Sequence, residues 1–171
     1  ACNGAISHIN DWLLLRPIFK DGRLIAYAAM FGHMTDVGGK VPGSLPTDAR
    51  EIFEEGIRIP PMKIYKKDEL QSDVLELILH NCRMPNWNRS DFNALVAAMR
   101  TAEKRVIEMA ERFGDDEYYS ALDELLARNK RAMAKLIKDT VPTKKQHFED
   151  YICDDGLGMG PYRIKCSMWR D

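Results

Sequence analysis

The chain has 171 residues, of which 45% are hydrophobic, so it can bury one sizeable core and requires no second domain. Its net charge of −1, with both signs interspersed, argues against a nucleic-acid-binding surface. It shows neither a signal-peptide pattern nor an apolar run of about 18 residues, so we expect no membrane partner. The four cysteines form no CxxC motif, which favours reduced thiols and a cytoplasmic location. Because the chain enters a motif almost at once without an initiator methionine, we expect a fragment of a larger subunit.

Two apolar runs near the start, 12–19 and 23–31, flank the dipeptide Asp21-Gly22. Asp-Gly between such runs predicts a β-hairpin, because a type I′ turn needs positive φ at both central residues. A two-residue loop at this position predicts three facing pairs: Lys20 with Arg23, Asn10 with His33, and Ser7 with Asp36.

Two pairs of the form His-x-x-Asp flank this hairpin, His8 with Asp11 and His33 with Asp36. The predicted hairpin brings both pairs to its open end. Imidazole and carboxylate groups that converge in this way suit a divalent metal ion. We therefore predict a metal site made by His8, Asp11, His33 and Asp36. Manganese, iron and zinc all accept this mixture of nitrogen and oxygen ligands, so the residues leave the choice of metal open.

The stretch from Asp36 to Pro46 contains three glycines and two prolines, which predicts an irregular loop. Because it follows the second His/Asp pair, we expect it to form a wall of the same site, with amides free to hold an anion; a surface connector is the alternative. A short turn or helix is expected over 49–56. An edge strand is expected over 57–65, since this segment alternates and contains two prolines. Glu55 either places a carboxylate near the site or is simply exposed.

Helical periodicity begins at Asp68 and predicts three helices. The first ends before Met84-Pro85, and a polar turn is expected over 86–90. The second runs to Gly114, a residue typical of the position after a helix end. The third ends before Pro142. Methionines on the apolar faces of these helices are interpreted as core filling rather than as metal ligands.

Strand character returns over 147–153 and 162–169, which predicts a second β-hairpin. Its loop contains Asp154 and Asp155. These acids could supply metal oxygens, but an acidic, glycine-rich loop is typical of a hairpin turn, and we favour that interpretation.

Together these elements predict an α+β fold, with an N-terminal β-hairpin and edge strand, a three-helix middle section and a C-terminal β-hairpin. We expect a single fragment over 1–171, in which 1–66 is mostly β and carries the metal site, 67–141 is helical and 142–171 is β.

Six short motifs also follow one another along the chain. They are His8-Ile9-Asn10-Asp11, Phe31-Gly32-His33-Met34-Thr35-Asp36-Val37-Gly38-Gly39, Pro42-Gly43-Ser44, Glu55-Gly56-Ile57-Arg58-Ile59-Pro60-Pro61, Asn81-Cys82-Arg83-Met84-Pro85 and Glu111-Arg112-Phe113-Gly114. This ordered series resembles the hydantoinase B/oxoprolinase family, and within it most closely the alpha-subunit branch of acetone carboxylase-type enzymes. Hydrolytic members usually carry proline where Asn10 stands and a second histidine where Met34 stands. These departures favour the carboxylase branch over hydantoin or oxoproline hydrolysis.

The resemblance implies a manganese-containing subunit of an ATP-dependent ligase that joins bicarbonate or CO2 to a small ketone, such as acetone, to give a 3-oxo acid. His8, Asp11 and His33 would be metal ligands, and Asp36 a fourth ligand or an orienting residue. A hydantoinase A-like partner subunit would bind ATP and Mg2+, and a small third subunit is expected. Two alternatives stay open: an ATP-dependent cyclic-amide hydrolase of the same family, and a non-catalytic scaffolding subunit.

Overall fold

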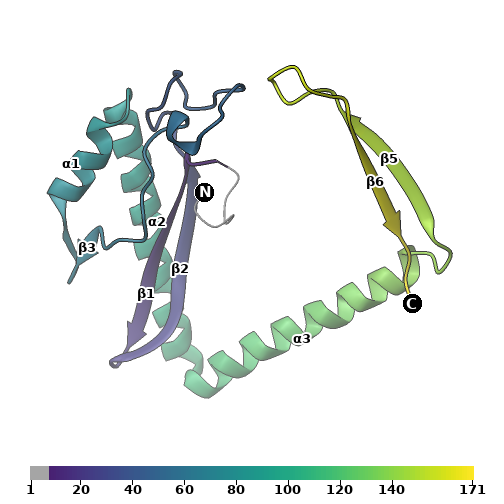
Figure 1. Ribbon diagram of the computed structural model, residues 1–171. Coiled ribbons are helices and arrows are strands. Elements are labelled where there is room, and N and C mark those ends of the chain that lie inside the picture. Colours follow the sequence, from purple (N-terminus) through teal and green to yellow (C-terminus); the bar gives the residue numbers. More distant parts are fainter. Residues whose placement is uncertain (1–7) are drawn as a thin grey trace. The chain divides into compact units, whose positions relative to one another are not determined.

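Residues 8–171 are described by a computed structural model (Figure 1). They form three α-helices and three antiparallel strand pairs, which confirms the predicted α+β class. The contacts divide the chain into two compact units, Ala1–Ile107 and Glu108–Asp171. The assignment of 1–171 to a single fragment of a larger subunit stays a prediction. None of the helices within 8–171 combines the length and apolar character needed to cross a membrane.

The predicted N-terminal hairpin is formed by β1 (Asp11–Lys20) and β2 (Arg23–His33). Asp21 and Gly22 connect the strands with φ values of 51° and 77°. Positive φ at both loop residues is what a type I′ turn requires, so the Asp-Gly signal is confirmed.

The register of this hairpin differs from the predicted one by a single residue. Ile25 on β2 has no partner on β1 and forms a β-bulge, so every pair beyond it is displaced by one position. Asp11 therefore faces His33, and the predicted pairing of Asn10 with His33 is wrong. Ser7 lies outside the described residues, so its predicted pairing stays a prediction.

Little regular structure connects this hairpin to the helices. The expected short helix is the 3-10 helix η2 (Ile52–Glu54). The edge strand predicted over 57–65 is wrong for most of its length, because only β3 (Tyr65–Lys66) pairs, with β4 (Glu69–Leu70). Pro60-Pro61 lack the N–H groups that a strand ladder needs, which explains the absence of pairing there.

Helix α1 (Ser72–His80) forms within the predicted segment, but it begins later than the expected start at Asp68, since Glu69–Leu70 pair as β4. Helix α2 (Pro85–Phe113) begins earlier than expected, and the predicted polar turn over 86–90 is wrong because those residues form its first turns. Proline suits a first helical position, since its φ is preset and the missing N–H has no helical acceptor there. Gly114 follows the helix with a φ of 87°, as predicted.

The core of the first unit lies between the β1–β2 hairpin, α1 and the first part of α2, and Figure 1 shows the hairpin running alongside α2. Gly32 of the hairpin lies so close to α2 that a Cβ atom there would be 2.9 Å from Leu95 Cδ1. Arg16 on β1 also donates to Glu103 on α2 at 2.8 Å. The most buried apolar side chains here are Ile18, Met34, Val37, Leu75, Leu79 and Phe92.

The second unit contains the end of α2, helix α3 (Asp115–Thr140) and the predicted C-terminal hairpin of β5 (Gln146–Ile152) and β6 (Tyr162–Met168). In its loop, Asp155 Oδ1 accepts the N–H groups of Leu157 at 2.8 Å and Met159 at 3.0 Å, which supports a turn role. Several large apolar side chains of α3 are exposed: Leu122, Leu125, Leu126, Met133, Leu136 and Ile137.

Candidate metal centre

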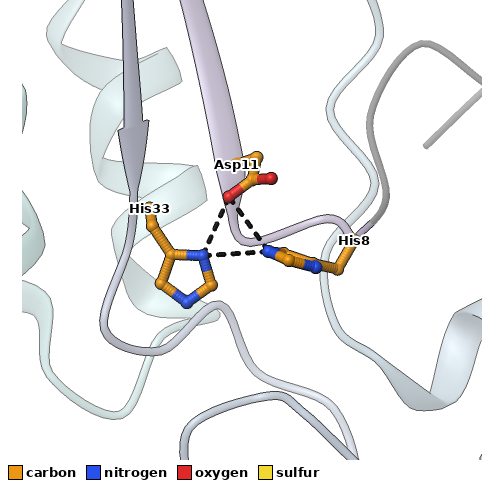
Figure 2. Close-up of side chains that lie close together, drawn as sticks. All are labelled: His8, Asp11 and His33. Carbon is orange, nitrogen blue, oxygen red and sulfur yellow. Dashed lines mark hydrogen bonds and ion pairs between the residues drawn. The ribbon is translucent and has the colours of Figure 1, made fainter.

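Three donor atoms converge at the open end of the β1–β2 hairpin, as Figure 2 shows. His33 Nδ1 lies 2.8 Å from Asp11 Oδ1, and His8 Nε2 lies 3.2 Å from the same oxygen. The two ring nitrogens are 3.0 Å apart. The Asp11 carboxylate is buried, whereas the His8 and His33 side chains are 33% and 43% exposed. Three of the four side chains predicted for the site are therefore brought together, with solvent access on the imidazole side.

Protons alone cannot satisfy all three contacts of this triangle. Each contact needs one hydrogen between a donor and an acceptor. Each ring nitrogen offers either one hydrogen or one lone pair, whereas the carboxylate oxygen offers two lone pairs. If both ring nitrogens carry hydrogen, Asp11 accepts from both but the nitrogens repel each other. If only one does, at least one contact has no hydrogen. A divalent cation would take a lone pair from all three atoms.

The spacing of the donors also fits such an ion. With metal–ligand distances of about 2.1 Å, two ligands at right angles lie about 3.0 Å apart, against about 3.4 Å in a tetrahedral arrangement. The observed separations of 2.8 to 3.2 Å match the first value. Two histidines and one carboxylate form a ligand set known for divalent iron and compatible with manganese.

Asp36, the fourth predicted residue, is held apart from this group. The donor atoms of His8, Asp11 and His33 lie within 4.8 Å of one another, and Asp36 is not among them. Its side chain is 2% exposed, and both oxygens are occupied by hydrogen bonds. Asp36 therefore anchors the structure beside the site.

Four donors bind the Asp36 carboxylate. Oδ1 accepts the N–H groups of Gly38 at 2.9 Å and Arg83 at 3.0 Å. Oδ2 accepts the Gly43 N–H at 2.9 Å and Arg83 Nη1 at 3.0 Å. Burial raises the pKa of Asp36, but these hydrogen bonds outweigh it and lower the pKa to about 2. The group is consequently ionised at neutral pH.

Arg83 belongs to one of the six motifs, but the sequence alone predicts no role for its side chain. Besides Asp36, its guanidinium donates to the carbonyl oxygens of Gly38 at 3.1 Å, Val41 at 3.0 Å and Gly39 at 2.5 Å. It thereby closes the glycine-rich loop around the buried carboxylate. A buried carboxylate needs a cationic or hydrogen-bonding partner, but the sequence does not identify Arg83 among the arginines as that partner.

Asn10 and Met34, the two departures from the hydrolytic pattern, are both buried, with exposed fractions of 0% and 1%. Asn10 Nδ2 donates to the carbonyl oxygens of Met34 at 3.0 Å and Gly43 at 3.1 Å, and the Met34 N–H donates to Asn10 O at 2.8 Å. Both residues therefore tie the end of the hairpin to the loop. Both side chains thus belong to the packing behind the candidate site.

A hollow of about 310 Å³ opens beside the triad, lined by His8, Ser44, Leu45, Pro46, Thr47 and Glu55. The glycine-rich loop thus forms a wall of the site, as expected. The expectation that its amides would hold a ligand is not met at Gly38 and Gly43, since both N–H groups bind Asp36.

Comparisons with known proteins agree with this architecture. The sequence model of the family "Hydantoinase B/oxoprolinase" matches residues 1–171. Caprolactamase subunit beta of Pseudomonas jessenii is 35% identical over 95% of this chain, and the acetophenone carboxylase delta subunit of Aromatoleum aromaticum is 30% identical over 94%. The chain spans only 28% and 23% of the length of these relatives.

Two solved structures are similar as well. The crystal structure of ATP-dependent caprolactamase from Pseudomonas jessenii matches with a TM-score of 0.88 and 34% identity, over 96% of this chain and 28% of that one. Nucleotide-free acetone carboxylase matches with a TM-score of 0.78 over 85% of this chain and 19% of that one; at 22% identity this likeness shows the fold alone. With a family model that covers its whole length, the chain belongs to the hydantoinase B/oxoprolinase family.

Proposed function

We propose that this chain forms the metal-holding part of an ATP-dependent enzyme that acts on the carbonyl group of a small molecule, with hydrolysis of a cyclic amide as the first candidate. The observation that carries the proposal is the convergence of His8 Nε2, Asp11 Oδ1 and His33 Nδ1 within 3.2 Å of one another, next to an open hollow. A divalent ion bound there would polarise a carbonyl oxygen as a Lewis acid.

The residues around the triad divide into two roles. His8, Asp11 and His33 would hold the ion, and the exposed ring edges of the two histidines would leave space for a substrate oxygen. Asp36 and Arg83 would keep the loop in place, because their hydrogen bonds fix the backbone that forms one wall of the hollow. Asp36 is thus proposed as an orienting residue rather than a fourth ligand.

One finding favours a cyclic amide over a ketone. The relative named as a caprolactamase subunit is 35% identical over 95% of this chain, above the 30% identity to the carboxylase subunit.

Ketone carboxylation is the second candidate. It is supported by 30% identity to the acetophenone carboxylase delta subunit and by the motif resemblance to acetone carboxylase-type alpha subunits. In that case a small ketone and bicarbonate would be the substrates and manganese the metal. In both cases a hydantoinase A-like partner would bind ATP and Mg2+, and a small third subunit belongs to the carboxylase candidate.

One assay on the intact enzyme with its co-purifying subunits distinguishes the two candidate functions. ADP release and products are measured with ATP and Mg2+ plus either a lactam, 5-oxoproline or hydantoin, or acetone with bicarbonate. We expect ADP release coupled to ring opening of a cyclic amide, and its loss in the His33→Ala variant. Formation of a 3-oxo acid from the ketone, without ring opening of any amide, would replace the first candidate by the second.

A further inference from the structure

Glu55 is a carboxylate beside the triad that the metal centre does not use. It lines the same hollow as His8 and is half-buried. Within the described part of the chain, its carboxylate takes part in no hydrogen bond or ion pair. The neighbouring Glu54 differs, since it pairs with Lys40 at 2.9 Å. A charged group kept without a partner at the wall of a hollow is available to a ligand.

The backbone on both sides of Glu55 is held to the glycine-rich loop. The Lys40 N–H donates to Glu54 O at 2.8 Å, and the Ile57 N–H donates to Val37 O at 2.8 Å. These two hydrogen bonds flank Glu55, so its side chain starts from a fixed position.

The segment that carries Glu55 and the glycine-rich loop lie so close together that only glycine fits at two positions. A Cβ atom at Gly39 would lie 2.4 Å from Glu54 O, and one at Gly56 would lie 2.4 Å from Val37 O. Both glycines have positive φ, 79° and 130°, which other residues adopt only with strain. The segment that carries Glu55 is therefore built tightly onto the loop that walls the hollow.

The lining of the hollow combines three kinds of chemistry. His8 belongs to the triad, Leu45 and Pro46 are apolar, and Glu55 is an unpaired hydrogen-bond acceptor. This combination fits a small ring that has methylene groups, a carbonyl oxygen and a nearby hydrogen-bond donor.

We propose that Glu55 accepts a hydrogen bond from the N–H group of the substrate while the adjacent carbonyl group faces the triad. The hollow would thereby recognise the neighbouring C=O and N–H groups of a cyclic amide, and Glu55 would be the specificity-determining residue. This inference rests on the proposed function and narrows it. A ketone has no N–H group, so it would leave the Glu55 carboxylate without a partner, which opposes its binding.

The test is a binding cycle with two ligands, a lactam with an N–H donor and its N-methyl analogue, in which a methyl group replaces the donor hydrogen. ε-Caprolactam and N-methyl-ε-caprolactam are titrated calorimetrically, without ATP, into the intact Mn2+-loaded enzyme as wild type, Glu55→Ala and Glu55→Gln. We expect wild type to bind the N–H lactam about 10- to 100-fold more tightly than its N-methyl analogue. Glu55→Ala should bring the two affinities within about twofold of each other, and Glu55→Gln, which keeps an acceptor oxygen, should retain part of the preference.

Two controls accompany the cycle. Glu51→Ala removes an exposed carboxylate from the same segment outside the lining of the hollow, and should leave the preference unchanged. Metal content per folded chain should be equal in all variants, which shows that Glu55 acts on the substrate and not on the metal.

Each outcome gives a decision. If Glu55→Ala keeps the full preference for the N–H lactam, Glu55 is not the acceptor, while lactam binding that still requires the metal would leave the proposed function standing. If wild type binds both lactams equally well after metal removal, the metal takes no part in binding, and the proposed function fails together with this inference. If wild type binds neither lactam, this inference fails, and the assay with 5-oxoproline, hydantoin and acetone decides the proposed function separately.

Discussion

Asp11 lies directly across the β1–β2 hairpin from His33, and its Oδ1 is 2.8 Å from His33 Nδ1. The two residues are 22 positions apart, an even separation. A two-residue turn pairs residues with odd separations, as it does for Lys20 and Arg23. One residue must therefore leave the ladder, and the bulge at Ile25 provides this. Without it, the carboxylate and the imidazole would lie on opposite faces of the hairpin.

This relationship predicts opposite effects for two changes of chain length. Deleting Ile25 removes the bulge and keeps Asp11 opposite His33, so metal affinity should survive even though the hairpin loses a buried side chain. Inserting one alanine after Ile25 moves Asn10 opposite His33, and Mn2+ affinity should fall by at least about 100-fold. Titration of Mn2+ followed by electron paramagnetic resonance measures both variants. Wild-type affinity in the insertion variant would contradict the role of the register.

A second prediction concerns the pH dependence of stability. The pKa of Asp36 lies at about 2 in the folded protein, below the ordinary 3.8, so its ionised form favours folding. This contribution, about 2 kcal/mol, is fully present above the ordinary pKa and disappears as the pH falls towards 2. We expect Asp36→Asn to be at least about 2 kcal/mol less stable than wild type at pH 7, with the difference shrinking between pH 5 and pH 2. Urea unfolding at each pH tests this, and a difference that stays constant with pH would argue against it.

Arg83 offers a third prediction, with Arg89 as its matched control. Lysine cannot reproduce the planar set of donors that Arg83 directs at Asp36 and at three loop carbonyls. Arg83→Lys should therefore lower metal affinity about 10- to 100-fold, because the loop beside the triad loosens. Arg89 forms a half-exposed pair with Glu76, so Arg89→Lys should change the affinity by less than about twofold. Equal effects of the two substitutions in a Mn2+ titration would show that the loop does not support the site.

Local sequence chemistry was sufficient for much of the fold. Asp21-Gly22 predicts the first hairpin because its turn type depends on two adjacent residues, and α1 and α3 follow from the spacing of apolar residues. The first helix ends before Met84-Pro85 as predicted, but Pro85 also begins α2, so the predicted polar turn over 86–90 is wrong. Proline both stops helices and begins them, and only packing distinguishes the two.

The sequence predicts which side chains gather at the candidate site, but not their exact geometry. The spacing of His8, Asp11 and His33 predicts that they lie close together, whereas the expected register contains no bulge and so does not place Asp11 opposite His33. The role of Asp36 depends on Arg83, which lies 47 positions further along the chain. A contact of that range is decided by tertiary packing, so no local motif reveals it.

A fourth prediction concerns the exposed face of α3. Leu125 and Leu126 are 55% and 70% exposed, and they lie among other exposed apolar side chains of the same helix. The isolated chain should self-associate at micromolar concentrations and show no ATP hydrolysis of its own. Replacing both leucines with glutamate should shift it towards monomer, whereas Lys130→Glu, at an exposed position, should not. Sedimentation velocity distinguishes these cases; a wild-type chain that stays monomeric over the whole range would refute the expectation.

The most direct test of the metal centre is the content of manganese, iron and zinc per folded chain, measured by mass spectrometry on the intact complex. Wild type should retain close to one divalent ion, and His8→Ala, Asp11→Ala and His33→Ala should each lose it, because removal of a ligand lowers affinity by orders of magnitude. Asp36→Asn should weaken retention about 10- to 100-fold, and His80→Ala, at an exposed position, should change nothing. A folded His33→Ala protein that keeps the full metal complement would contradict the centre proposed here.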